Sequence, residues 1–128
     1  MLDFAKKDFS KKPREKYLSE ISKWQNSLVL VSEETKFLAK LLNTGIFEPN
    51  IPNLEERLQQ YSKKIQNFKN GAKLMEKEIE NHKTDVAKEC EENGEQNASL
   101  IKTTHIELRK NIKSFLKRNS NLKLKILN

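Results

Sequence analysis

Residues 53–93 read NLEERLQQYSKKIQNFKNGAKLMEKEIENHKTDVAKECEEN, and this stretch decides the fold. Within it, mostly apolar residues recur at alternating intervals of four and three residues, which is the heptad pattern of a helix that packs one face against other helices. These positions, the seam of this helix, are Leu58, Tyr61, Ile65, Phe68, Ala72, Met75, Ile79, His82 and Val86. A helix of this length spans roughly 60 Å at about 1.5 Å per residue. Because it cannot cover its own seam, the sequence predicts further helices along it.

The same spacing occurs in residues 13–44 and 95–127, which we predict to be helices as well. The first seam is Tyr17, Ile21, Trp24, Leu28, Val31, Thr35, Leu38 and Leu42. The third seam is Ala98, Ile101, His105, Leu108, Ile112, Phe115, Asn119, Leu122 and Ile126. Pro13 suits the first position of a helix, where its missing N–H costs nothing. Residues 2–9 could form a separate short helix before it.

Short connections between three helices predict an all-α fold, an elongated antiparallel up-down-up three-helix bundle in a single domain of residues 1–128. One connection surrounds Gly94. The other, at 45–52, contains Gly45, Pro49 and Pro52 and cannot be helical throughout. We expect its apolar side chains to cover the end of the bundle; they are Ile46, Phe47 and Ile51.

The predicted first helix carries a second apolar stripe, formed by Leu30, Phe37 and Leu41, with Glu34 among them. A helix with two apolar stripes is covered on two sides. The second cover could be a third helix, the N-terminal segment, or another subunit that completes a larger bundle. Leu30, Phe37 and Leu41 are therefore the candidate interface residues.

Composition limits the class of protein. The chain has 128 residues, a net charge of +7 and a single cysteine, Cys90. One cysteine cannot form a disulfide within the chain, which fits a reducing compartment. There is no readable signal peptide and no apolar run of transmembrane length, so we expect a cytoplasmic protein with no membrane partner. The 27 residues of 102–128 carry eight Lys or Arg against one Glu. Such a basic end could meet nucleic acid, an anionic membrane or an acidic partner, or it could be a solvent-exposed helix surface with Lys favoured near the helix C-terminus.

The two histidines, His82 and His105, both occupy seams. They lie 12 residues before and 11 residues after Gly94, so an antiparallel pair of helices places them at nearly the same height. The same register brings Tyr17 to that height, with Glu20 nearby and Glu78 one turn from His82. The sequence therefore predicts a polar core layer of Tyr17, His82 and His105.

This layer has two interpretations. Glu78 and His82 share a helix face, and a second imidazole from His105 would add to a ligand set that a transition metal accepts. Alternatively, the imidazoles bond each other, Tyr17 or Glu78 and fix the register of the helices. In the second case Glu78 is also placed to pair with Arg109. Two histidines and one carboxylate are few for a metal centre, so we predict a structural layer and no cofactor.

Several short patterns resemble those of a group of small bacterial helical-bundle proteins of unknown function, which are themselves remotely similar to hemerythrin-like bundles. These are Trp24 followed by Glu34 and Phe37-Leu38, Glu78-x-x-x-His82, and His105-x-Glu107-Leu108-Arg109 with Phe115. The resemblance implies a helical bundle. Hemerythrins hold two irons with five histidines, and with two histidines this chain departs from that pattern, so a complete di-iron site is excluded.

The sequence contains no Gly-rich phosphate loop and no recognisable catalytic triad. We therefore expect a non-enzymatic protein that acts by protein–protein contact, most simply by self-association into a homo-oligomer. Two alternatives remain open. One is a metal- or oxygen-related bundle that uses His82 and His105. The other is non-specific binding of nucleic acid through the basic third helix.

Overall fold

The computed structural model describes the backbone of residues 2–44, 52–92 and 95–127, and the side chains of residues 14–44, 52–88 and 98–127. In this part of the chain it contains three helices and no strand: α1 (Leu2–Asn43), α2 (Leu54–Glu92) and α3 (Glu95–Leu127). The prediction of an all-α fold is confirmed. The connection at 45–51, where we expected Ile46, Phe47 and Ile51 to cover the bundle end, lies outside the described residues.

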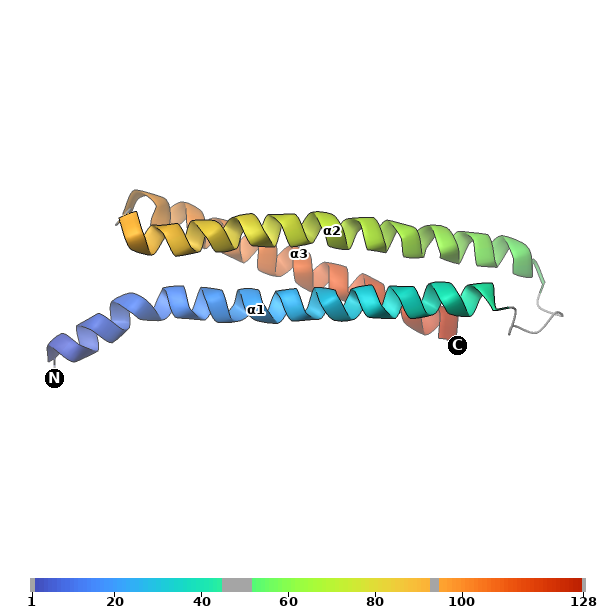
Figure 1. Ribbon diagram of the computed structural model, residues 1–128, viewed down its shortest axis with the longest axis horizontal. Coiled ribbons are helices and arrows are strands. Elements are labelled where there is room, and N and C mark those ends of the chain that lie inside the picture. The colour runs from blue at the N-terminus through green and yellow to red at the C-terminus, as the bar shows by residue number, and fades with distance from the viewer. Residues whose placement is uncertain (1, 45–51, 93–94, 128) are drawn as a thin grey trace.

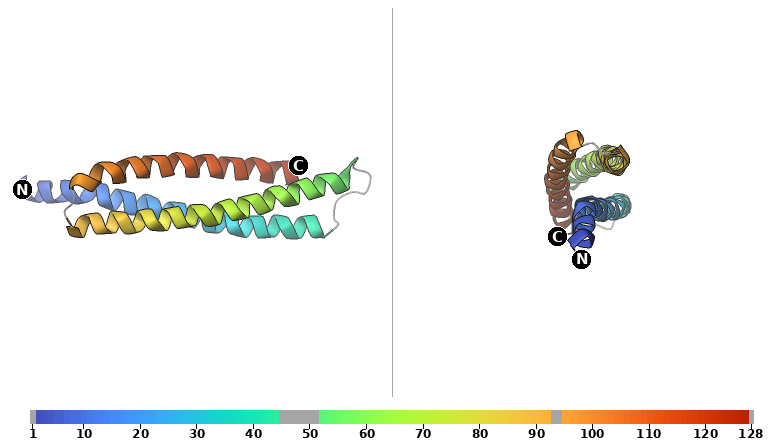
Figure 2. Two further views of the ribbon diagram at one scale, coloured as in Figure 1. Left: turned by 90° about the horizontal axis from the view of Figure 1, so that it is seen from above. Right: turned by 90° about the vertical axis from the view of Figure 1, so that its left-hand side faces the viewer.

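The helices form an elongated up-down-up bundle (Figure 1). α2 runs antiparallel to α1, and α3 returns in the direction of α1. Seen end on in Figure 2, the helices lie at the corners of a triangle rather than in a flat layer. Each helix therefore has one face toward a shared core and one toward the outside.

The start of α1 differs from the prediction. α1 begins at Leu2 and continues through Pro13 as one helix, whereas we expected Pro13 to be the first residue of the helix, after a separate short helix. The blue first turns of α1 leave the axis of the rest and project beyond the other helices (Figures 1 and 2). A proline inside a helix removes one hydrogen bond and bends the axis, which explains the change of direction without a break.

α2 begins one residue later than predicted, and its start has a defined geometry. Asn53 has a φ of 56°, in the left-handed region that asparagine tolerates better than most residues. Its carbonyl oxygen accepts the N–H of Arg57 at 3.0 Å, which is the first hydrogen bond of the helix. The turn out of the 45–52 connection therefore ends at Asn53.

The predicted seams form the core. All described seam residues are buried or half-buried except Ala98, which is exposed at the start of α3. The buried apolar residues fall into two clusters. The first core cluster is Ile21, Trp24, Leu28, Val31, Ala72, Ile79, Val86, Ile101, Leu108, Ile112 and Phe115. The second core cluster is Leu38, Leu42, Ile65, Leu122 and Ile126. Fully burying one such side chain contributes about 1.5–3 kcal/mol, so the seams account for most of the driving force that holds the helices together.

Candidate functional site

The structure brings the two histidines into direct contact in the part of the bundle that contains the first core cluster. His82 on α2 and His105 on α3 are 2% and 0% exposed, respectively. The Nε2 atom of His82 lies 2.8 Å from the Nδ1 atom of His105, a hydrogen-bond distance. The two residues meet because α2 and α3 are antiparallel and the residues are nearly equidistant from the turn between these helices.

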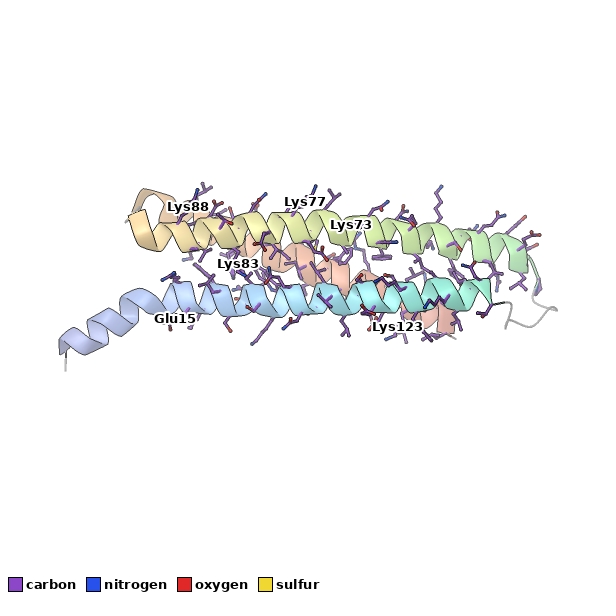
Figure 3. The ribbon with its side chains drawn as sticks, viewed as in Figure 1. Glu15, Lys73, Lys77, Lys83, Lys88 and Lys123 are labelled. Carbon is purple, nitrogen blue, oxygen red and sulfur yellow. The ribbon has the colours of Figure 1, made fainter. Side chains whose placement is uncertain are left out.

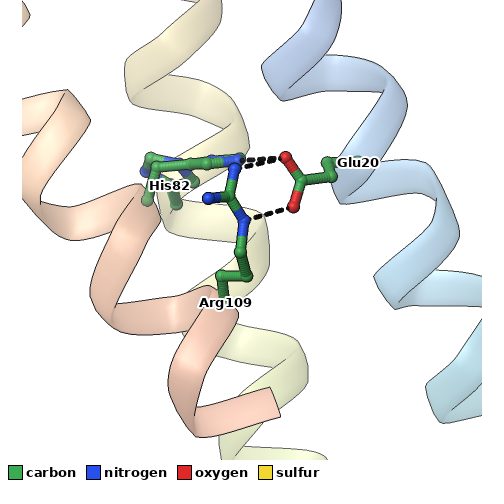
Figure 4. Close-up of polar contacts among 4 residues, drawn as sticks. Glu20, His82 and Arg109 are labelled. Atoms are coloured by element: carbon green, nitrogen blue, oxygen red, sulfur yellow. Dashed lines mark hydrogen bonds and ion pairs between the residues drawn. The ribbon is translucent and has the colours of Figure 1, made fainter. Parts of the chain in front are cut away.

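A carboxylate from α1 extends this contact to the surface. The Nε2 atom of His105 lies 3.2 Å from Oε1 of Glu20. Glu20 also accepts two hydrogen bonds from the guanidinium of Arg109 on α3, each of 2.6 Å. Figure 4 shows this arrangement, in which the carboxylate of Glu20 is held by both partners. The Glu20 and Arg109 side chains are 30% and 50% exposed, respectively, so a continuous polar chain runs from the core to solvent and joins all three helices.

The carboxylate fixes where the hydrogens lie. An ionised carboxylate only accepts hydrogen bonds, so Nε2 of His105 carries a hydrogen and donates it to Glu20. Neutral His105 then has a bare Nδ1, which accepts the Nε2–H of His82. Neutral His82 in turn has a bare Nδ1, and this buried atom has no partner. A proton added to His82 would need an acceptor at Nδ1 that is not there.

Aromatic side chains enclose His105. The Tyr17 and Trp24 rings lie beside it, with centroids 4.3 and 4.6 Å from that of the imidazole and interplanar angles of 37° and 32°, respectively. Tyr17 thus belongs to the layer as predicted in position, but through its ring: the hydrogen bonds of His105 go to His82 and Glu20. These rings keep water away from the imidazoles.

The surroundings lower the pKa values of Glu20, His82 and His105. Hydrogen bonds from Arg109 lower the pKa of Glu20 to about 2, despite its partial burial. Burial lowers the pKa of both His82 and His105 from 6.5, although Glu20 acts in the opposite direction on His105. At neutral pH the site is therefore a carboxylate, a guanidinium and two neutral imidazoles.

The two contacts considered for Glu78, a hydrogen bond to an imidazole of the layer and an ion pair with Arg109, are not found among the described side chains. Glu78 is exposed on α2, and the partner of Arg109 is Glu20. Arg109 lies on the flank of α3 that faces α1, since its guanidinium bonds an α1 residue, and it therefore turns away from α2. The carboxylate of the histidine layer comes from Glu20, and the pairing of helix heights alone could not distinguish the two flanks.

The geometry of the histidine pair is that of a hydrogen bond. Two ligand nitrogens at about 2.0–2.1 Å from a tetrahedral metal would be roughly 3.4 Å apart, whereas these nitrogens are 2.8 Å apart. Within the described side chains, no group of at least three His, Cys, Asp or Glu residues is arranged to hold a metal ion. The side chain of Cys90 is outside the described part.

Two further polar residues of the seams are buried between the core clusters, and we call them the second polar layer, although no hydrogen bond joins them. This layer was not predicted. Thr35 and Asn119 are both 3% exposed, and each lies between the two core clusters along its own helix. The hydroxyl of Thr35 donates to the carbonyl oxygen of Ser32 at 2.9 Å, while Nδ2 of Asn119 is buried without a partner. The signal was present in the sequence, because both residues occupy seam positions.

The three candidate interface residues differ in how exposed they are. Leu30 and Phe37 are 60% and 59% exposed on α1, whereas Leu41 is half-buried and packs against the second core cluster. Glu34, which lies between them in sequence, forms an ion pair of 3.4 Å with Lys123 of α3. The exposed stripe is therefore Leu30 and Phe37, on the side of α1 next to α3.

No family model, curated protein or solved structure matches the chain. These comparisons therefore neither support nor oppose the hemerythrin-like resemblance of the short motifs. None of the helices, within the residues described, is both long and apolar enough to cross a membrane.

Proposed function

We propose that this chain is a non-enzymatic bundle of the cytoplasm that acts by protein–protein contact, through self-association along the outer face of α1. The observation that carries the proposal is the exposure of Leu30 and Phe37, at 60% and 59%. They lie seven residues apart, and therefore on one side of the helix, the exposed flank of α1 next to α3.

A second copy of the chain is the occupant that suits this stripe. A dimer with two-fold symmetry uses the same patch on both copies. If two α1 helices cross antiparallel about a point between residues 33 and 34, Leu30 of each copy meets Phe37 of the other. Both exposed side chains are then covered by a single operation.

The size of the stripe sets the strength of the contact. A standard interface buries about 800 Å² per partner, and an aromatic side chain contributes roughly 150–250 Å². Two large side chains supply less than half of the standard area, and the remainder comes from the polar surface of α1. We therefore expect a weak, concentration-dependent dimer rather than an obligate one.

The histidine layer supports a structural role more than a catalytic one. Both ring nitrogens of His105 are engaged, and His82 is 2% exposed. Neither imidazole is presented to a substrate, as general acid–base catalysis requires. We assign the layer to holding the three helices in register, with Glu20 and Arg109 as its outer end.

Sedimentation velocity or light scattering over a range of protein concentrations tests the proposal. We expect the mass to rise from monomer toward dimer with concentration, and the double substitution Leu30→Ser, Phe37→Ser to keep the protein monomeric. The matched control is Leu74→Ser with Leu100→Ser, which removes two leucines that are 64% and 66% exposed on α2 and α3. A strict monomer at the highest concentration, or an equal effect of the control pair, would contradict self-association through α1.

A further inference from the structure

α3 has a charge balance unlike that of the rest of the molecule. Between residues 98 and 127 it carries eight Lys or Arg and a single acid, Glu107. Two of these cations are committed to ion pairs, Arg109 with Glu20 and Lys123 with Glu34. The other six form no ion pair within the described side chains; they are Lys102, Lys110, Lys113, Lys117, Arg118 and Lys125.

The two ion pairs also fix how α1 and α3 lie side by side. Each pair joins residues separated by the same number of positions, 20 with 109 and 34 with 123, so α1 and α3 run parallel in one register. Lys16 and Lys23 lie one turn before and one turn after Glu20, on the same side of α1. On α3, Lys113 follows Arg109 by one turn.

These residues form a cationic face across two helices. It consists of Lys16 and Lys23 on α1 and of Lys102, Arg109 and Lys113 on α3, all exposed, around the carboxylate of Glu20. Glu20 is already bonded to Arg109, which leaves four lysines without an acidic partner on the face. Lys110 and Lys117 extend the α3 row along the outside of the bundle.

We propose that this cationic face binds the phosphate backbone of duplex nucleic acid without sequence preference. Its two rows of charge follow neighbouring helices, whose axes lie about 8–10 Å apart. The grooves of a duplex, about 6 and 12 Å wide, are bordered by rows of phosphate at a comparable spacing. A Lys on each row can therefore approach phosphates on both edges of one groove, and contacts of this kind carry no base information.

Two other polyanions suit the face less well. Single strands are held largely by stacking of bases on exposed aromatic rings, but Tyr17 and Trp24, the aromatic residues at this height of α1, are packed against His105. A helix that lies in an anionic membrane surface inserts its apolar face. In α3 the continuous apolar face is the seam, which is buried in the core, and the exposed apolar residues do not form a second stripe; they are Leu100, Ile106, Leu124 and Leu127.

Fluorescence anisotropy with a labelled DNA duplex of mixed sequence, titrated at several salt concentrations, tests this inference. Each phosphate neutralised contributes about 0.9 to the slope of log Kobs against log salt. Because four free lysines line the face, we expect a slope of about −3 to −4. Lys102→Gln with Lys113→Gln should reduce the magnitude of that slope by about 2 and weaken binding equally for duplexes of different sequence.

The matched control makes the same change of charge on another face. Lys73 and Lys77 are exposed on α2, and Figure 3 shows Lys77 on the side of α2 away from α1. Lys73→Gln with Lys77→Gln should leave the slope nearly unchanged. Equal loss in the control, no binding at low salt, or tighter binding to anionic lipid vesicles than to the duplex would each overturn the proposal. Because the Leu30→Ser, Phe37→Ser variant keeps the cationic face, its duplex binding separates this proposal from self-association.

Discussion

The bundle contains two buried polar layers, and they differ in where their hydrogen bonds go. In the histidine layer, His82 bonds His105, which bonds Glu20, and Glu20 meets Arg109 at the surface. In the second layer, Thr35 bonds the backbone of its own helix, and the Nδ2 of Asn119 has no partner. One layer links all three helices, whereas the other forms no hydrogen bond between helices among the described side chains.

The difference shows what makes a polar core layer useful. A buried polar group that lacks a partner costs about 1–3 kcal/mol, and both layers contain one such atom, at Nδ1 of His82 and at Nδ2 of Asn119. Only the histidine layer offsets that cost, through charge-assisted bonds at its outer end. We therefore expect the histidine layer to specify helix register and the Asn119 layer to weaken the core between the two clusters.

The largest expected effect is the loss of His105. His105→Ala opens a cavity against Tyr17 and Trp24 and leaves the N–H of His82 without an acceptor. We therefore expect it to destabilise the bundle by about 3–5 kcal/mol. Asn119→Ala should cost clearly less, since it removes an unpartnered amide together with its packing. Urea denaturation of both variants measures the comparison. Equal losses would show that the two layers contribute alike.

The second prediction concerns pH. Unfolded histidines titrate near 6.5, and burial lowers the pKa of His82 and His105 in the fold. Above pH 6.5 both states are neutral and the stability is complete. As the pH falls below this value, the unfolded chain takes up protons that the buried pair does not, so stability decreases. Glu20 adds a further loss between pH 4.5 and about 2.

Thermal denaturation followed by circular dichroism across this range measures both steps. The double variant His82→Leu, His105→Leu should lose the decrease that begins at pH 6.5, and it retains the acid step because Glu20 still pairs with Arg109. Asn119→Leu is the matched substitution in the other layer and should keep the complete profile. A profile that is unchanged in the histidine variant would refute the assignment of the upper step.

A substitution at Asn119 is expected to change the free energy of unfolding by less than His105→Ala does, and in the opposite direction. Replacing its amide with an apolar side chain of similar size removes the unpartnered Nδ2 and joins the two core clusters, so Asn119→Leu should stabilise the bundle by about 1–2 kcal/mol. The corresponding change in the histidine layer, His82→Leu, should destabilise it, since Nδ1 of His105 loses its donor. Urea denaturation of both variants measures the difference. If the two denaturation midpoints shift in the same direction, the two layers do not differ as proposed.

The sequence predicted more of the fold than of the site, for a physical reason. Heptad spacing determines which residues face the core, and the three seams are buried as expected, apart from Ala98 at the end of the bundle. Height along the helices also followed from counting residues from Gly94, which placed His82 beside His105. The flank of a helix on which a long side chain points did not follow from counting. Counting therefore offered Glu78 as a possible partner of Arg109, whereas the partner is Glu20, and the continuation of α1 through Pro13 was missed.

The smallest effect lies between the two layers, where α2 and α3 approach closely. A Cβ atom added at Gly71 would lie 3.2 Å from Cε2 of Phe115, and that ring is 4% exposed and packs against Phe68 at a centroid distance of 5.4 Å. Gly71→Ala gains about 1 kcal/mol of helix propensity, but overpacking of a core typically costs about 1–3 kcal/mol. Because the added Cβ makes one tight contact, at 3.2 Å, we place the cost of overpacking at the lower end of that range and expect a net loss below about 1 kcal/mol.

The background variant Phe115→Leu separates these two contributions at Gly71. With the smaller side chain the clash disappears, so Gly71→Ala made in Phe115→Leu should be stabilising by about 1 kcal/mol relative to Phe115→Leu alone. Urea denaturation of the four proteins gives the coupling directly. If Gly71→Ala has the same effect in both backgrounds, the glycine is not required for the approach of α3, and the spacing of the helices between the two layers must be set by the layers themselves.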